Sequence, residues 1–220
     1  RVHRRQRQMC IRDRYIYILK TTGKSMKSSS ETEKNFIKKG FYLINNIGWE
    51  EFSLEKLSTK ENIPIEDLKD FFKCKYSIVD KFSRMVDKNI ESKLKIEDFK
   101  DSSKKDILFE LIMMRFDEME EFKGSLAKIL DASRNKPLLI SIITKNVMNT
   151  MDFFLELSDS YNNYAFDVLK KNFLFLIYSI TFKTWLSDNT EELSKTMAEL
   201  DRLLSTAENF QQKVSSFLPI

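Results

Sequence analysis

The sequence predicts an all-α protein, and two observations carry that prediction. Glycine and proline are scarce, with 4 and 3 among 220 residues, which leaves few turn formers for the many tight turns of a β protein. Apolar residues instead recur every three or four positions, the spacing of a helix with one buried face. We therefore expect about nine helices, and a chain of this length can bury a sizeable core.

The first expected helix begins at Ser30, where Glu33, three residues later, completes a capping box. Gly40 allows a close contact with a neighbouring helix, and Gly48 ends the helix as a C-terminal cap. The apolar face of this helix consists of Phe36, Leu43, Ile44 and Ile47.

Three more helices complete the N-terminal part of the chain. Ser53 caps the second helix, which points Leu54 and Leu57 inward. Pro64 begins the third, because proline favours the first helical position, and its core-facing residues are Leu68, Phe71 and Phe72. The fourth covers residues 77–94, with an apolar stripe of Ile78, Phe82, Met85 and Val86.

A polar linker at residues 95–103 is the best boundary between the two halves of the chain. Ser103, with Asp106 three residues later, opens the next helix, and Pro137 starts another. The later segments are a loop at 159–164, the most apolar helix at 165–186, and a last helix to residue 210 that is capped by Asp188. The longest apolar run, residues 173–182, is far shorter than the roughly 20 residues a bilayer needs, so we expect no transmembrane helix.

Residues 36–79 have the order of a helix-turn-helix, although two short helices joined by a turn also occur in other all-α proteins. The residues from Leu54 to Val79 are similar to the N-terminal domain of TetR-type regulators. Leu57-Ser58 stands for the family's I-A, Asn62-Ile63 for its G-V, and Pro64–Lys69 for the start of its recognition helix. The remaining matches are Phe72, Lys75 and Ile78 for F-x-x-K-x-x-L, and Gly48-Trp49 for the glycine-aromatic end of helix one.

The C-terminal half resembles the same TetR/AcrR superfamily through SSKKDILFELIMMRFDEM and TWLSDNTEELSKTMAELDRLLSTAE. The chain is also similar to ubiquinone-biosynthesis accessory proteins that use this fold to bind lipid. The resemblance implies a helix-turn-helix domain at residues 30–76 and a ligand-binding and dimerisation domain at 77–220. It also implies a homodimer joined through the last two long helices, for which residues 165–186 and 188–210 are the candidates.

Two functions follow from the resemblance. The first is a TetR-type transcriptional regulator that binds DNA and a small apolar ligand. The alternative is a lipid- or quinone-binding accessory protein of ubiquinone biosynthesis that does not bind DNA. One fold hosts several roles, so the resemblance does not choose between them.

The candidate DNA-binding residues are Ser53, Lys56, Lys60, Pro64, Glu66, Asp67, Lys69, Asp70, Lys73 and Lys75. Serine and lysine at these positions are expected to contact phosphates. The recognition helix is nevertheless acidic, since Glu66, Asp67 and Asp70 lie on it, and carboxylates near phosphates are repulsive. One of them can accept a hydrogen bond from a cytosine amino group; alternatively, the acidic face is simply solvated.

The candidate ligand-binding residues are Met113, Phe116, Met148, Met151, Phe154, Phe175, Tyr178 and Phe182. Methionine and aromatic side chains suit an apolar ligand between helices. The same residues at helical spacing also build ordinary cores, and some could form the dimer face. The terminal helix, with Phe210, Val214, Phe217 and Leu218, could rest on a membrane surface but lacks a basic polar face.

Residues 1–14, RVHRRQRQMCIRDR, resemble translated sequencing-adapter sequence, and we expect residues 1–25 to be a non-native leader with a natural start at Met26. A basic arm for nucleic acid is the alternative. The full chain has 37 basic and 33 acidic residues; without residues 1–14, which hold six arginines and one aspartate, 31 and 32 remain. No global basic field is then left to favour nucleic acid.

The sequence supplies no set of catalytic residues. Beyond the leader there is no histidine and a single cysteine, Cys74, while the adjacent Glu120 and Glu121 are expected on an exposed helix face. We therefore expect a cytoplasmic protein that is not an enzyme and that needs no cofactor or metal.

Overall fold

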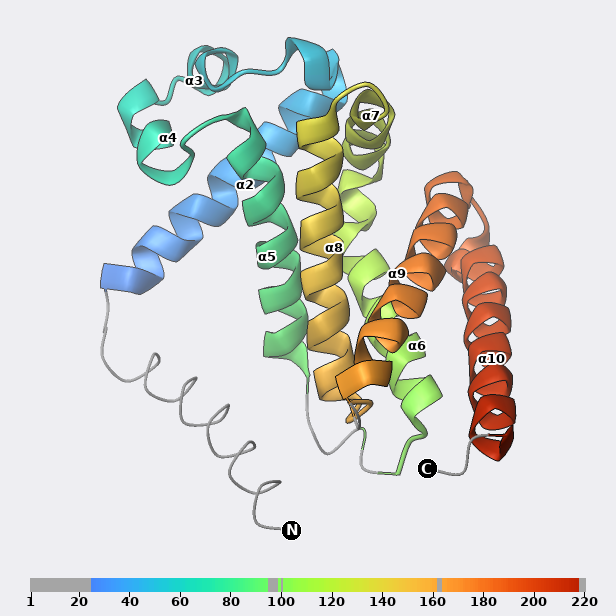
Figure 1. Ribbon diagram of the computed structural model, residues 1–220. Coiled ribbons are helices and arrows are strands. Elements are labelled where there is room, and N and C mark those ends of the chain that lie inside the picture. The colour runs from blue at the N-terminus through green and yellow to red at the C-terminus, as the bar shows by residue number, and fades with distance from the viewer. Residues whose placement is uncertain (1–24, 95–98, 100, 162–163, 218–220) are drawn as a thin grey trace.

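The structure, a computed structural model, describes residues 25–94, 99, 101–161 and 164–217, and every element in those ranges is helical (Figure 1). This confirms the all-α prediction. The N-terminal helices are α2 (Ser25–Glu51), α3 (Leu54–Glu61) and α4 (Ile65–Phe71). They lie together at one end of the molecule (Figure 1). The expected leader lies outside the described residues, except for Ser25 at the start of α2.

A long helix, α5 (Lys75–Lys93), leads from α4 into a bundle (Figure 1). The bundle contains α6 (Lys104–Met119), α7 (Lys123–Ser133), α8 (Pro137–Leu157), α9 (Tyr164–Ser187) and α10 (Ser194–Phe217), with short 3₁₀ turns η2 (Glu120–Phe122) and η3 (Glu191–Leu193). Helix α8 packs against α5, α7 and α9, and α10 packs along α9 at one edge.

Most of the expected helix ends are where local chemistry places them. The Ser53 hydroxyl accepts a hydrogen bond from the backbone N–H of Lys56 at 3.2 Å, and the Ser103 hydroxyl accepts one from Asp106 at 3.1 Å. Gly48 breaks α2 with φ 81° and ψ 165°, a conformation that side-chain-bearing residues rarely adopt. These observations confirm the caps at Ser53 and Ser103 and the helix break at Gly48.

Several helix boundaries differ from the expected ones. Helix α2 begins at Ser25, before the expected Ser30, and Pro64 precedes the first residue of α4 as its N-cap. No pattern in the sequence predicted that α6 ends at Met119, where η2 turns the chain into α7. Phe122 in η2 is 2% exposed, and its ring meets the Phe41 and Phe82 rings at 5.6 and 5.1 Å. Burial of this aromatic side chain by tertiary contacts therefore fixes the turn.

One hydrophobic cluster extends through both halves of the chain, from Phe36 to Leu204. The Phe41 ring of α2 stacks on Phe82 of α5, with centroids 3.9 Å apart. A Cβ on Gly40 would lie 2.1 Å from the end of the Ile78 side chain, so glycine permits this close packing of α2 on α5. The N-terminal helices and the bundle therefore share a core through α5.

In the described part of the chain, α8 is long and apolar enough to cross a membrane by length and composition, with a mean hydropathy of 1.2. The prediction of no transmembrane helix rested on the run at 173–182, which lies in α9 and not in this helix. A third of the most apolar window of α8 is buried, and helices inside a bundle pass the same test of length and composition.

Candidate DNA-binding surface and ligand region

Helices α3 and α4 form a helix-turn-helix around a short polar turn. Asn62 ends α3 in the left-handed conformation, with φ 52° and ψ 45°, which asparagine tolerates better than most residues. The Ser58 hydroxyl donates to the Ile63 carbonyl at 2.6 Å, and the Ile63 N–H donates back to the Ser58 carbonyl at 3.0 Å. Leu57 and Leu68 are fully buried beneath the turn, so the opposite side of α4 faces outward.

The outward side of α4 is acidic. Glu66, Asp67 and Asp70 are all exposed, and Lys69 is the basic residue among them. The exposed members of the predicted DNA-binding set are Lys56, Lys60, Pro64, Glu66, Asp67, Lys69, Asp70 and Lys73, and the half-buried members are Ser53 and Lys75. The structure therefore brings the predicted residues onto one module with an accessible face.

Two of the five candidate lysines already have partners within the chain. Lys56 forms an ion pair with Glu51 at 2.6 Å. Lys75 donates to the backbone carbonyls of Trp49 at 3.2 Å and Phe52 at 3.1 Å, and its ammonium lies 5.1 Å from the centre of the Trp49 ring. Trp49 follows the kink at Gly48 and Phe52 lies just beyond the end of α2, and Lys75 satisfies the carbonyl groups of both residues.

The predicted ligand residues lie within the bundle. Phe116 of α6 meets Tyr178 and Trp185 of α9 with ring centroids 5.5 and 5.3 Å apart, and Phe182 lies against the same group. Phe116 is fully buried and Tyr178 is 3% exposed. The remaining members of the set are Met113 on α6, Met148, Met151 and Phe154 on α8, and Phe175 on α9, all buried or half-buried. The structure therefore brings Phe116, Tyr178 and Phe182 together as a packed aromatic cluster.

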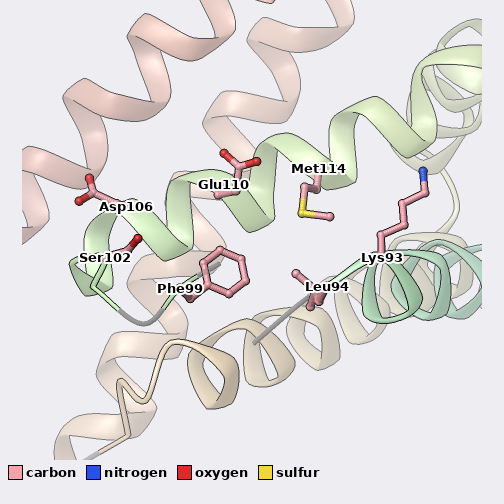
Figure 2. A pocket seen from close by; sticks show the side chains of 7 residues that line it. All are labelled: Lys93, Leu94, Phe99, Ser102, Asp106, Glu110 and Met114. Atoms are coloured by element: carbon pink, nitrogen blue, oxygen red, sulfur yellow. The ribbon is translucent and has the colours of Figure 1, made fainter. Parts of the chain in front are cut away.

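A pocket of about 380 Å³ lies elsewhere, where the end of α5 faces α6 (Figure 2). Figure 2 shows Leu94, Phe99 and Met114 around it, with Asp106 and Glu110 on the same side of α6. Lys93 and Ser102 complete the lining. Sequence reasoning did not find this pocket, because one face of α6 meets the end of α5 and the segment that connects them only in the folded chain.

No protein-family model matches the chain, and no curated protein matches it. Among solved structures, it is similar to the crystal structure of the TetR transcriptional regulator from Nitrosomonas europaea ATCC 19718, with a TM-score of 0.69 and 17% identity over 81% of this chain and 98% of that chain. The chain has a TetR-like fold. At this identity the similarity establishes the fold.

Within this TetR-like fold, sequence reasoning missed a buried polar network centred on Arg115. The Arg115 side chain on α6 is 3% exposed, and its guanidinium pairs with Asp87 of α5. It also donates to the Ser83 hydroxyl on α5 at 2.9 Å and to the Tyr178 hydroxyl on α9 at 3.0 Å. Thr150 of α8 donates to the other Asp87 oxygen at 2.9 Å. The sequence feature that indicates this network is the arginine inside the apolar run LIMMRF.

A second buried network fixes the corner between α9 and α10 of the TetR-like fold. The Asp188 carboxylate is 2% exposed and accepts hydrogen bonds from the backbone N–H and hydroxyl of both Thr190 and Thr196, at 2.5–2.9 Å. Burial works to raise the pKa of Asp188, but these hydrogen bonds outweigh it and hold the pKa well below its usual range. Thr196 lies in the first turn of α10, so Asp188 bonds to the start of the last helix as expected. The helix itself begins at Ser194, after η3, and not directly after Asp188.

Proposed function

We propose that this protein is a TetR-type transcriptional regulator, with a helix-turn-helix domain at residues 30–76 and a ligand-binding and dimerisation domain at 77–220. The observation that carries the proposal is the α3–turn–α4 unit, whose inner side is buried and whose outer side is accessible. A helix presented in this way from a fixed core is the arrangement that enters a DNA major groove. The TetR-like fold supports the same function by analogy.

The charges on this surface define the kind of DNA binding we propose. Three lysines are exposed on this surface: Lys60 on α3, Lys69 on α4 and Lys73 just after α4. We assign them to phosphate contacts. Glu66, Asp67 and Asp70 repel phosphates but can accept hydrogen bonds from cytosine amino groups. We therefore expect weak non-specific affinity and a sequence preference that includes C·G pairs.

We further propose a homodimer that pairs through α9 and α10. Apolar side chains recur along one face of α9, and they remain exposed in the single chain: Leu169, Phe173, Leu176 and Ile180. Phe210 of α10 extends this face, with its ring 6.1 Å from that of Phe173. Exposed apolar stripes of this kind mark interaction surfaces, and a two-fold dimer would cover the same stripe on both copies.

A small apolar ligand would act on this dimer by population shift. The aromatic cluster of Phe116, Tyr178 and Phe182 is packed in the single chain, so ligand entry requires these rings to move. A ligand that binds better to the rearranged bundle would change the spacing of the two helix-turn-helix units and hence DNA affinity.

A salt-titrated binding assay tests the DNA-binding proposal. Fluorescence anisotropy would compare duplexes from the DNA flanking this protein's gene with shuffled duplexes of the same composition, from about 50 to 200 mM salt. We expect one flanking duplex to bind more tightly than its shuffled control at every salt concentration. Equal binding of all duplexes, or no binding near 50 mM salt, would refute the proposal.

A second candidate function is a lipid- or quinone-binding accessory protein that does not contact DNA. The observation that favours it is the charge on α4, with three exposed carboxylates and a single lysine. Native mass spectrometry of the purified protein tests this alternative. A co-purified isoprenoid or phospholipid would support it, whereas a protein that is empty and binds its flanking DNA would eliminate it.

A further inference from the structure

Helix α5 belongs to both halves of the molecule. In its first half, Phe82 stacks on Phe41 of α2 within the core of the helix-turn-helix end. Ser83, the next residue, and Asp87, about one turn later, bond to Arg115 of the bundle. Because an α-helix is stiff over this length, a tilt of α5 at Asp87 would be carried to α3 and α4.

The Arg115–Asp87 pair ties α5 to three other helices at one point. Asp87 accepts from Arg115 of α6 through one oxygen and from Thr150 of α8 through the other. Arg115 also donates to Ser83 of α5 and to Tyr178 of α9. The guanidinium therefore donates three hydrogen bonds in different directions. Two of them reach residues of α5 and the third reaches α9.

The chemistry of this network is better suited to fixing the orientation of α5 than to stabilising the fold. A buried ion pair is often no more stable than apolar residues of the same volume, because both charges lose their hydration. The guanidinium is a rigid planar fork, however, and its donors point in fixed directions. Ser83, Asp87 and Tyr178 accept from three of these donors together only when α5 has one particular rotation and height against α6 and α9.

We propose that Arg115 is a positioning residue that sets the orientation of α5, and hence of the helix-turn-helix, relative to the bundle, and that ligand occupancy reaches it through the Tyr178 hydroxyl. Tyr178 stacks on Phe116 in the predicted ligand cluster, so a ligand that moves this ring removes an acceptor from Arg115. This second half of the inference rests on the proposed regulatory function. The first half requires neither DNA nor ligand.

The geometry makes the effect measurable. Cys74, the N-cap of α5, lies about 20 Å from Asp87 along the helix at 1.5 Å per residue. A tilt of about 10° at Asp87 therefore moves Cys74 by about 3.5 Å. Cys74 is an exposed free thiol, which makes it a native attachment site for a probe.

The test is a distance measurement by pulsed electron paramagnetic resonance on the full chain. Spin labels would be placed on Cys74 and on Asn149→Cys, an exposed position of α8, in a Cys10→Ser background. Dilution with unlabelled protein restricts the signal to pairs within one chain. Tyr178→Phe keeps the ring packed against Phe116 but removes the acceptor of Arg115. Arg115→Lys keeps the charge facing Asp87 but removes the fork.

We expect both variants to shift or broaden the distance distribution by about 3 Å while the circular dichroism spectrum stays helical. The matched control is Tyr161→Phe, which loses a hydrogen bond to Asp152 in the same bundle without touching Arg115, and it should leave the distribution unchanged. An unchanged distribution in Tyr178→Phe, or equal broadening in the control, would overturn the inference. A shift in a protein that binds no DNA would defeat the proposed function while leaving the positioning role intact.

Discussion

Replacing Asp188 by alanine is expected to lower the free energy of unfolding by about 3 kcal/mol. The carboxylate is buried and accepts four hydrogen bonds, two of them from the backbone N–H groups of Thr190 and Thr196. Loss of a capping side chain costs up to about 2 kcal/mol. The Thr196 N–H, on a residue with no exposed surface, would also lose its partner, and a buried unpaired donor costs about 1–3 kcal/mol.

Denaturant unfolding followed by tryptophan fluorescence would measure this loss, because Trp185 lies three residues from Asp188 and is fully buried. A loss of about 3 kcal/mol corresponds to a fall in Tm of roughly 6–12 °C for a chain of this size. The control is Asp131→Ala, which removes an exposed ion pair with Arg134 and should change stability by less than about 1 kcal/mol. Equal stabilities of the Asp188→Ala and Asp131→Ala variants would refute the assigned role of this cap.

The depressed pKa of Asp188 adds a pH signature to the same experiment. A carboxyl group whose pKa is lower in the folded than in the unfolded state stabilises the fold above the unfolded pKa of about 3.9. That contribution is lost as the pH falls from there through the folded pKa. The difference in unfolding free energy between wild type and Asp188→Asn should therefore be constant from about pH 7 to pH 5 and shrink below about pH 4. A difference that already falls between pH 7 and pH 5 would contradict the assignment.

Three further substitutions test other parts of the structure. Gly48→Ala should destabilise the protein by about 1–3 kcal/mol in denaturant unfolding, because φ 81° with ψ 165° is strained for any side chain; a neutral effect would contradict this backbone conformation. Lys75→Ala should cost about 1–3 kcal/mol through the carbonyls of Trp49 and Phe52 that it leaves without their partner, whereas Lys73→Ala, at an exposed neighbour, should not. Leu176→Glu places a charge in the exposed stripe of α9 and should convert a dimer into a monomer, as measured by light scattering. The control, Asn149→Glu on α8, should leave the dimer intact. A dimer that survives Leu176→Glu would rule out this face of α9 as the dimer interface.

The features that sequence reasoning predicted well are those with local causes. Ser53 and Ser103 each bond to a backbone N–H three residues ahead, so the chain segment itself contains both partners. Gly48 likewise satisfies a local backbone requirement. The helix-turn-helix was predictable because its turn and its buried residues lie within a single stretch of sequence.

The features that sequence reasoning missed depend on residues far apart in the chain. The break after Met119 is set by Phe122 packing on Phe41 and Phe82, and no helix-breaking residue marks it. Arg115 is buried because its acceptors come from α5 and α9, which periodicity on α6 cannot indicate. Lys75 was predicted to contact phosphate, yet it caps the end of α2, because the kink at Gly48 leaves carbonyls within its reach.

The most direct test of the proposed function is the salt dependence of DNA binding in wild type and in the Lys60→Ala/Lys73→Ala variant. Each phosphate contact contributes about 0.9 to the slope of log affinity against log salt. If both lysines of both protomers touch phosphates, the slope should become shallower by about 3.6 for a dimer, and the preference for the flanking duplex over its shuffled control should persist. An identical slope in the two proteins, or no preference for any flanking duplex, would contradict DNA binding through α3 and α4.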